Sequence, residues 1–192
     1  MSFTFGIPSP DVITALQRVR TRVFQTVTSP SEARQAFEAG VDGLVVQAAT
    51  AGGHSGTLTP RVLPTAVPLP ELVASVRAIT KLPIIGGGGI GEPGDVAAAL
   101  AAGASAVAVG TLLLRSGEAG TSAPYRAALA DPARTETVVT RAFTGRPARG
   151  LRNVFTDRYT GIAPSGYPAL HHLTRPIRRA AAEAGDPERI NL

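Results

Sequence analysis

Short apolar runs alternate with amphipathic stretches over the first two thirds of the chain. Five of the runs have the length and the β-branched or aromatic content of strands. These runs are residues 3–5, 22–28, 43–47, 82–86 and 106–110. Because they are continuously apolar, they are typical of strands covered on both faces. Their regular alternation with helical patterns predicts an α/β fold of parallel strands joined by crossover helices.

The helical stretches carry start and stop signals. Ser9-Pro10 opens a helix through about Val19, with Ser at the cap and Pro in the first turn. The sequence Ser-Pro-Ser-Glu at 29–32 has the spacing of a capping box and predicts a helix that ends near residue 40. Further helices are expected at about 70–80 and 95–102.

The chain changes character after about residue 120. The remainder carries 11 of the 18 Arg residues, several Pro residues and no apolar run of strand length. We expect a helical, loop-rich segment over 120–192 that packs on the α/β part over 1–119. The whole chain, 1–192, is then a single domain, within the usual size range.

Composition excludes several classes of function. The absence of Cys excludes disulfides, thiolate zinc sites and Cys nucleophiles. No apolar stretch reaches the 18 or so residues of a spanning helix, and the N-terminus lacks a signal-peptide pattern. We therefore expect a cytoplasmic protein without membrane contact. The net charge of +5 comes from scattered Arg residues with few aromatics, which does not favour nucleic-acid binding.

A glycine-rich run, GGGGIG at 86–91, follows one strand and precedes a helix. It fits the dinucleotide pattern G-x-G-x-x-G, but that site also needs an acidic residue at the end of the next strand. That strand ends instead in Gly110-Thr111. A barrel phosphate site fits better, with Gly88-Gly89 in one loop and Gly110-Thr111 in the next. The alternative is that these glycines serve only tight turns.

A histidine lies between glycines in the loop 51–56, just after the strand that ends at Gln47. Parallel α/β sheets build their sites at this end of the strands, and the ordinary pKa of His suits proton transfer. His54 is thus either a catalytic base or a loop residue with a structural hydrogen bond. His171-His172 has no Cys or carboxylate at ligand spacing, so we expect no metal there. The run 145–150 is either an anion-binding loop or a surface connection.

These motifs together resemble the FMN-dependent nitronate monooxygenases, formerly called 2-nitropropane dioxygenases. Related flavin-dependent enoyl-ACP reductases share part of the pattern. The resemblance covers nearly the whole chain. It rests on the sequences VVQ at 45–47, AGGHSG at 51–56, PII at 83–85, GGI at 88–90 and VGT at 109–111, with support from 140–150 and 167–173.

The resemblance implies FMN as cofactor and the oxidation of alkyl nitronates with O₂. It implies that His54 is the catalytic base. Residues matched to positions beside the flavin or its phosphate are Gln47, Gly52, Gly53, Gly88, Gly89, Gly110 and Thr111. The chain departs from the family at Ala48, Thr50 and Ala108, where Gly, Glu and Gln are usual, and at Gly86-Gly87. These departures concern flavin contacts and loop rigidity.

Length is the larger departure, because a full (β/α)₈ barrel takes about 250 residues. By resemblance the five expected strands are strands four to eight, and the first three are absent. Five strands cannot close a barrel, so we expect a partial TIM barrel with open edges. Such a chain is expected to form homo-oligomers, to aggregate or to bind FMN weakly. The alternatives are an enoyl-ACP reductase-like enzyme, or an inactive partial barrel that binds only a phosphate ligand or another chain.

Overall fold

The computed structural model describes residues 1–190 and divides the chain into two compact units. Unit 1 comprises Met1–Ala51, Ser55–Thr59 and Pro64–Gly110. Unit 2 comprises Gly52–His54, Pro60–Leu63 and the described residues from Thr111 onward. The single domain with a change of character at residue 120 remains a prediction.

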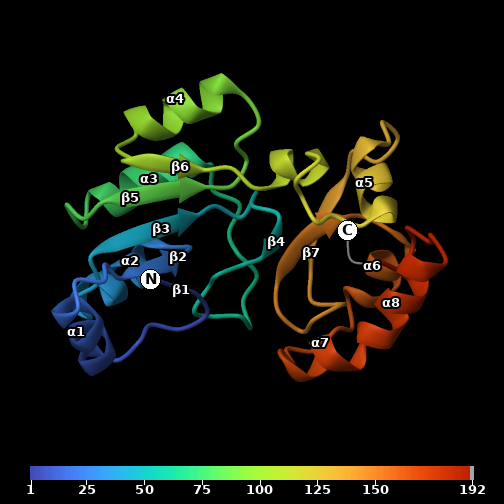
Figure 1. The fold of residues 1–192 in the computed structure, drawn as a ribbon, viewed down its shortest axis with the longest axis horizontal. Helices are drawn as coiled ribbons and strands as arrows, with labels where there is room; N and C mark the ends of the chain where they lie inside the picture. Colours follow the sequence, from blue (N-terminus) through green and yellow to red (C-terminus); the bar gives the residue numbers. More distant parts are fainter. Residues whose placement is uncertain (191–192) are drawn as a thin grey trace. The chain divides into compact units, whose positions relative to one another are not determined.

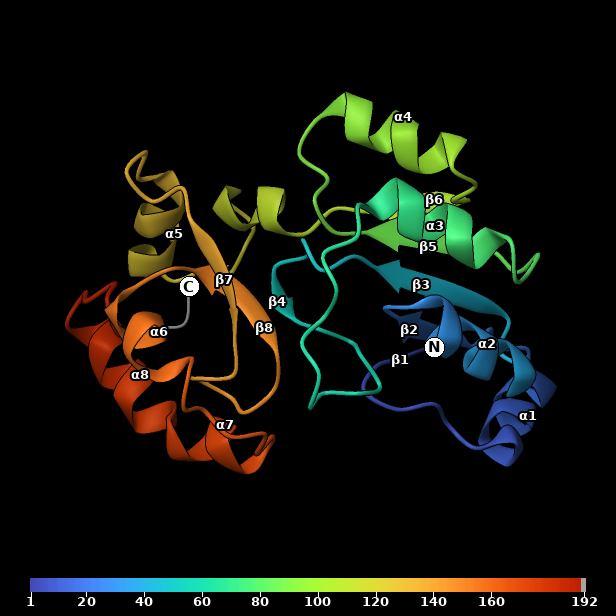
Figure 2. The same ribbon diagram turned by 180° about the vertical axis from the view of Figure 1, so that it is seen from behind.

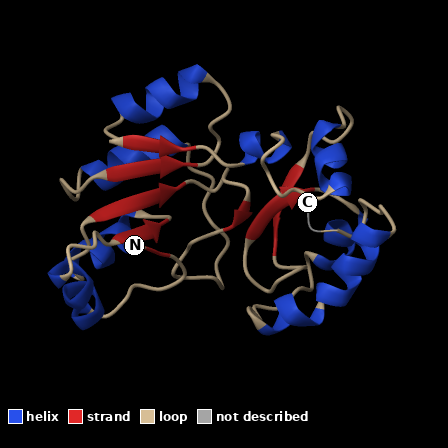
Figure 3. Ribbon diagram, in the orientation of Figure 1, coloured by secondary structure: helices blue, strands red, loops and turns tan. Residues whose placement is uncertain are grey.

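Unit 1 is built on a five-stranded sheet in the order β1-β2-β3-β5-β6, and every neighbouring pair is parallel (Figure 3). Its helices follow strands in the chain (Figure 1), as crossover connections do. The prediction of a partial TIM barrel with five parallel strands is confirmed. The strands are β1 Ser2–Phe3, β2 Phe24–Val27, β3 Gly43–Gln47, β5 Ile84–Gly87 and β6 Ala106–Ala108. The helices are α1 Pro10–Arg18, α2 Pro30–Glu38, α3 Leu69–Arg77 and α4 Pro93–Ala101.

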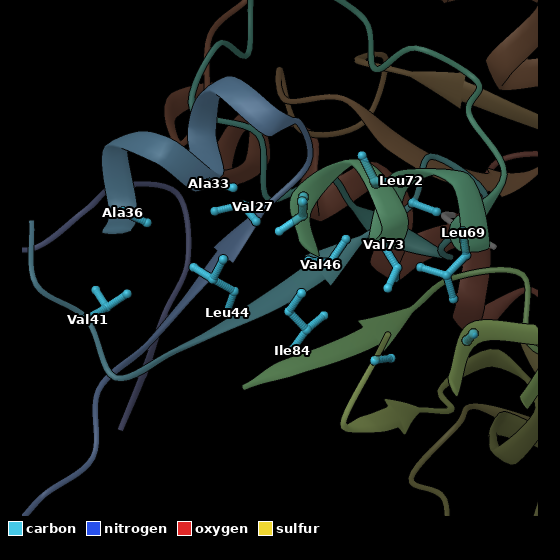
Figure 4. Packing of buried hydrophobic residues seen from close by; sticks show 14 of the residues in the cluster. Val27, Ala33, Ala36, Val41, Leu44, Val46, Leu69, Leu72, Val73 and Ile84 are labelled. Carbon is cyan, nitrogen blue, oxygen red and sulfur yellow. The ribbon is translucent and has the colours of Figure 1, made fainter. Parts of the chain in front are cut away.

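One face of this sheet forms the core. Val27, Leu44, Val46 and Ile84 are fully buried and point toward α2 and α3 (Figure 4). Each such side chain contributes about 1.5–3 kcal/mol through its burial. Side chains on the opposite face alternate with these and are less covered. Phe24, Val45 and Ile85, for example, are only half-buried.

The predicted capping box at the start of α2 is only half formed. Ser29 Oγ accepts the N–H of Glu32 at 3.2 Å, as a cap should. The carboxylate of Glu32 does not return to Ser29. Instead it accepts hydrogen bonds from Thr28, Thr57 and Leu58. A local sequence pattern is here overridden by donors that the fold brings close.

Unit 2 combines a small antiparallel sheet with helices. The sheet has the order β4-β8-β7, with β4 Gly53–His54, β7 Thr137–Thr140 and β8 Ala148–Leu151. The expectation of a helical, loop-rich segment is therefore incomplete, because it omitted β7 and β8. The helices are η1 Thr111–Arg115, a 3₁₀ helix, α5 Ala123–Ala130, α6 Val154–Tyr159, α7 Ala169–Leu173 and α8 Arg175–Glu183 (Figure 2). No helix within residues 1–190 is long and apolar enough to cross a bilayer.

Candidate functional site

Gln47 stands at the carboxyl end of β3 and holds the chain that follows His54. Its Oε1 accepts the N–H of Gly56 at 2.6 Å. Gly56 packs tightly here, since a Cβ on it would lie 2.5 Å from Thr26 Cγ2. In unit 1, therefore, the side chain of Gln47 fixes the loop geometry next to the strand end.

Gly88 and Gly89 follow β5 in left-handed conformations, with φ of 107° and 74°. A Cβ on Gly88 would lie 2.9 Å from the backbone N of Ala51, and one on Gly89 would lie 2.8 Å from Thr50 Oγ1. Only glycine meets both demands without strain. Thr50 and Ala48, two positions that depart from the family pattern, take part in this packing. The carbonyl oxygen of Ala48 would lie 3.0 Å from the Cβ on Gly88.

The N-terminus of α4, just beyond this loop, already has an anionic partner. Asp95 Oδ2 accepts the N–H groups of Gly91 and Glu92, each at 2.9 Å. These two bonds lower the pKa of the Asp95 carboxyl, so it is ionised at neutral pH. The N–H groups of Gly91 and Glu92 are therefore already paired within the chain.

Gly110 and Thr111 follow β6 and fall in different units. Gly110 ends unit 1, and there is open space where its Cβ would be. Thr111 begins η1 in unit 2, with its Oγ1 only 2.6 Å from the position of a Cβ on Gly52. The structure thus brings Thr111 together with one of the predicted flavin neighbours.

His54 lies in β4 and is fixed in unit 2 on two sides. Its backbone pairs with Ala148 of β8, while Gly53, at φ 76°, pairs with Arg149. Its Nε2 lies 2.9 Å from the hydroxyl of Thr144, which is 1% exposed. The imidazole is therefore oriented by a buried polar group.

Aromatic and basic groups surround this imidazole. The ring of Tyr167 meets the ring of His54 edge-on at 5.6 Å. Burial lowers the pKa of His54, and the positive groups of His171, Arg146 and Arg178 lower it further. His54 is consequently neutral at pH 7, the state in which an imidazole can accept a proton.

The prediction of site residues from sequence did not include Thr144, Arg146 or Tyr167. Each of them nevertheless lies in a segment that supported the family resemblance. The loop 145–150 is not a surface connection, because residues 142–148 are all buried. Gly145, at φ 79°, shows why: a Cβ there would lie 2.7 Å from the backbone N of Tyr167. Glycine at this position therefore lets the Tyr167 segment approach.

The predicted site residues divide between the units. Unit 1 holds Gln47, Gly88, Gly89 and Gly110, and unit 2 holds Gly52, Gly53, His54 and Thr111. Residues 1–190 contain no group of three or more His, Asp or Glu side chains placed to hold a metal ion. Unit 2 also has a cleft of about 430 Å³, among whose lining residues are Arg134, Arg152 and Glu188, and no predicted site residue lines it.

Comparison with known proteins gives a consistent assignment. A family model described as nitronate monooxygenase matches residues 1–192. A probable nitronate monooxygenase of Staphylococcus aureus (strain Newman) is 38% identical over 99% of this chain and 54% of its own length. A solved nitroalkane oxidase from Streptomyces ansochromogenes matches with a TM-score of 0.95 and 44% identity, over 100% of this chain and 56% of that one. FabK from Thermotoga maritima matches with a TM-score of 0.78 and 30% identity, over 99% and 58%.

The chain spans about half the length of the curated relatives it matches. Within that span the family model covers the chain from end to end. The residues that carried the resemblance in the sequence thus lie within a family match that covers residues 1–192. The chain belongs to the nitronate monooxygenase family.

Proposed function

We propose that the chain catalyses the FMN-dependent oxidation of alkyl nitronates with O₂, with His54 as the base. The observation that carries this proposal is the setting of His54 in a member of this family. The ring is oriented by the buried Thr144 hydroxyl at 2.9 Å and kept neutral by burial and nearby cations. An unprotonated imidazole is the form that a general base needs, and the lowered pKa keeps His54 in that form at neutral pH.

The residues of the predicted cofactor site fit an FMN phosphate. Gly88 and Gly89 stand in left-handed conformations, and successive amides in such turns can form a concavity that binds an anion. By the family resemblance, Gly110 and Thr111 are further candidates to hold the phosphate, and Gln47, Gly52 and Gly53 are candidates to hold the flavin ring. When bound, FMN supplies the transfer of electrons from substrate to oxygen.

The hydroxyl of Thr144 orients the ring of His54. It lies 2.9 Å from Nε2 of His54, and it is itself held by the backbone of Arg146, with the carbonyl at 3.2 Å and the N–H at 3.3 Å. We assign to the ring held in this way the removal of the α-proton from a neutral nitroalkane.

The surrounding cations act on the products of that proton transfer. The guanidinium groups of Arg146 and Arg178 disfavour a protonated His54. The nitronate formed in the same step is an anion and offsets this charge. These cations therefore disfavour protonation of His54 by water. They oppose its protonation less when the proton comes from a substrate that becomes negative in the same step.

Two measurements test the proposal. The purified chain is mixed with FMN and passed through a gel-filtration column, and its visible absorption is recorded. Oxygen uptake with a neutral nitroalkane and with its preformed nitronate is then compared for wild type, His54→Ala and the control His172→Ala, whose side chain is exposed. We expect retained flavin and, with the neutral nitroalkane, a loss of about 10²–10⁴-fold in His54→Ala only, because the nitronate no longer needs a base. Loss of flavin on the column, or equal activity of all three proteins, would contradict the proposal.

A second candidate is NAD(P)H-driven enoyl reduction, favoured by the structural match to FabK. Enoyl reduction without any nitronate-dependent oxygen uptake would select it. An inactive partial barrel that binds only a phosphate ligand or another chain is selected if neither reaction occurs and His54→Ala changes nothing. Self-association through β1 and β6, the outer strands of the unit 1 sheet, stays a prediction that size-exclusion chromatography tests.

A further inference from the structure

Arg178, on α8, carries a positive charge that no carboxylate balances. Among residues 1–190, none of the ion pairs includes it, although its neighbour Arg179 pairs with Glu183 at 2.7 Å. Burial and the nearby Arg175 lower the pKa of the Arg178 guanidinium, but an arginine stays protonated at neutral pH. A half-buried charge is costly unless an opposite charge accompanies it. Arg178 therefore lacks the anion that its surroundings favour.

The hydrogen bonds of this guanidinium leave one side of it open. Nη2 donates to the carbonyl oxygen of His171 at 2.7 Å and lies 3.4 Å from Nδ1 of the same residue. Nε is buried without a hydrogen-bond partner. Nη1 also has no partner within the described part of the chain, but it is not one of the buried unpartnered atoms and so reaches solvent. Its two N–H groups are thus available to an acceptor from outside the chain.

The first turn of α8 is tied to the segment that orients His54. The buried hydroxyl of Thr174 donates to the carbonyl oxygen of Phe143, the residue before Thr144. The N–H of Arg178 donates to the carbonyl oxygen of Thr174 at 3.1 Å, so the two residues are one helical turn apart. All of these groups belong to unit 2. The position of Arg178 relative to Thr144 and His54 is therefore fixed by bonds within this unit.

A row of rings joins the candidate base to this arginine. The ring of Tyr167 lies 5.6 Å from that of His54 and 6.2 Å from that of His171. The Arg178 guanidinium is bonded to His171, and its charge reaches His54, because it is one of the cations that lower the pKa of that imidazole. The buried Arg146 acts in the same way, and no carboxylate is among the groups that shift this pKa. Uncompensated positive charge near the imidazole favours an anion there.

We propose that Arg178 is a substrate-binding residue, which holds the nitro group through the N–H groups of Nη1 while His54 takes the α-proton. This inference rests on the proposed function, because that function forms a nitronate at His54. In this step the C–H bond breaks, its proton goes to the imidazole, and its electron pair forms a C=N double bond while one N=O pair moves onto oxygen. The product is a planar group whose two oxygens share one negative charge, which a guanidinium binds as it binds a carboxylate. The attraction to Arg178 thus increases as the proton leaves.

The first test measures oxygen uptake with preformed ethyl nitronate, which is already an anion and needs no base. The full chain loaded with FMN is compared as wild type, Arg178→Gln and the control Arg179→Gln, whose arginine lies on the same helix and is paired with Glu183. We expect Arg178→Gln to raise KM about 10- to 100-fold, the effect of losing a hydrogen bond to a charged group. Arg179→Gln should leave KM unchanged. Equal KM values in the two variants would overturn the inference.

The second test needs neither turnover nor a correctly folded variant. Nitrate is the probe, because it is planar, carries one negative charge and has no proton to lose. The chain has three His residues, so NMR of the ¹³C-labelled imidazoles gives few signals, and His54→Gln assigns that of His54. We expect nitrate to shift the signals of His54 and His171 saturably in wild type and Arg179→Gln, but not in Arg178→Gln. Chloride at the same ionic strength should produce no saturable shift.

The outcomes separate this inference from the proposed function. Saturable binding of nitrate without oxygen uptake in wild type would refute the proposed function and retain the anion site. Oxygen uptake without nitrate binding, or with an equal shift from chloride, would refute the anion site and retain the function. Nitrate binding that survives in Arg178→Gln would show that another group holds the anion, and would overturn the inference.

Discussion

The carboxylate of Glu32 is the most densely bonded buried charge in unit 1. Its side chain is at the start of α2, and the residue is 4% exposed. Oε2 accepts the N–H of Thr28 at 2.6 Å and the Thr28 hydroxyl at 2.9 Å. Oε1 accepts the hydroxyl of Thr57 at 2.9 Å and the N–H of Leu58 at 2.7 Å. One side chain thus joins the end of β2 to the segment that follows His54.

Glu32→Gln should therefore destabilise the chain although it changes few atoms. Each oxygen receives one hydroxyl and one backbone N–H, so the new NH₂ group must face a backbone donor in either orientation. The hydroxyl can rotate and accept, but the N–H of Thr28 or Leu58 is left unpaired. An unpaired buried donor costs about 1–3 kcal/mol, and the other bonds lose their charge assistance. We expect a loss of about 2–4 kcal/mol in the free energy of unfolding.

Urea unfolding followed by far-ultraviolet circular dichroism measures this loss. The control is Glu38→Gln, an exposed residue in the last turn of the same helix. Removing a negative charge at that helix end should change stability by no more than about 0.5 kcal/mol. If Glu32→Gln matched Glu38→Gln within that margin, the idea that the Glu32 carboxylate holds the segment would be refuted.

Three further predictions concern the surroundings of His54. Thr144→Val should lower kcat/KM about 10- to 100-fold by releasing the imidazole, while Thr144→Ser, which keeps the hydroxyl, should retain most of the activity in oxygen-uptake assays. Gly145→Ala should reduce stability in urea by about 2–4 kcal/mol, since its Cβ would lie 2.7 Å from the backbone of Tyr167. The pKa of His54 is lowered in the folded chain, so the unfolded chain binds a proton at this residue more readily than the folded chain does. The contribution of neutral His54 to the free energy of unfolding is therefore fully present above about pH 6.5 and is lost as pH falls through the lowered pKa. The urea midpoint of wild type should therefore fall at acid pH more than that of His54→Gln.

The unit 1 sheet could be predicted because its signals are local. All five expected strands are present, since each is an apolar run with at least one side chain directed into the core. The strands of unit 2 gave a weaker signal. β7 and β8 have four residues each. β7 is β-branched throughout but short, and the sequence ARGL of β8 has only two apolar side chains. β4 pairs with β8 across nearly a hundred residues, a contact that no local pattern encodes.

The candidate site divides in the same way. Gly88 and Gly89 could be singled out from sequence because their left-handed turns require glycine. The partners of polar side chains could not, since they depend on which donors the fold brings within reach. Glu32 shows this most clearly: its position in the chain predicts a helix cap, but its carboxylate bonds Thr57 and Leu58.

The departure from the family pattern at Thr50 is favourable to an anion at the adjacent loop. Thr50 Oγ1 lies 2.8 Å from the position of a Cβ on Gly89, so whatever residue stands at 50 faces the loop assigned to the phosphate. A carboxylate about 4 Å from a phosphate charge would cost about 1–4 kcal/mol, depending on the local dielectric. The neutral hydroxyl avoids this repulsion and can donate a hydrogen bond. Asp95 already places one negative charge beyond the loop, and its exposed position leaves that charge screened by solvent. With Thr50 in place of an acid, the loop has no carboxylate at this position, and the departure is compatible with the phosphate proposed at Gly88 and Gly89.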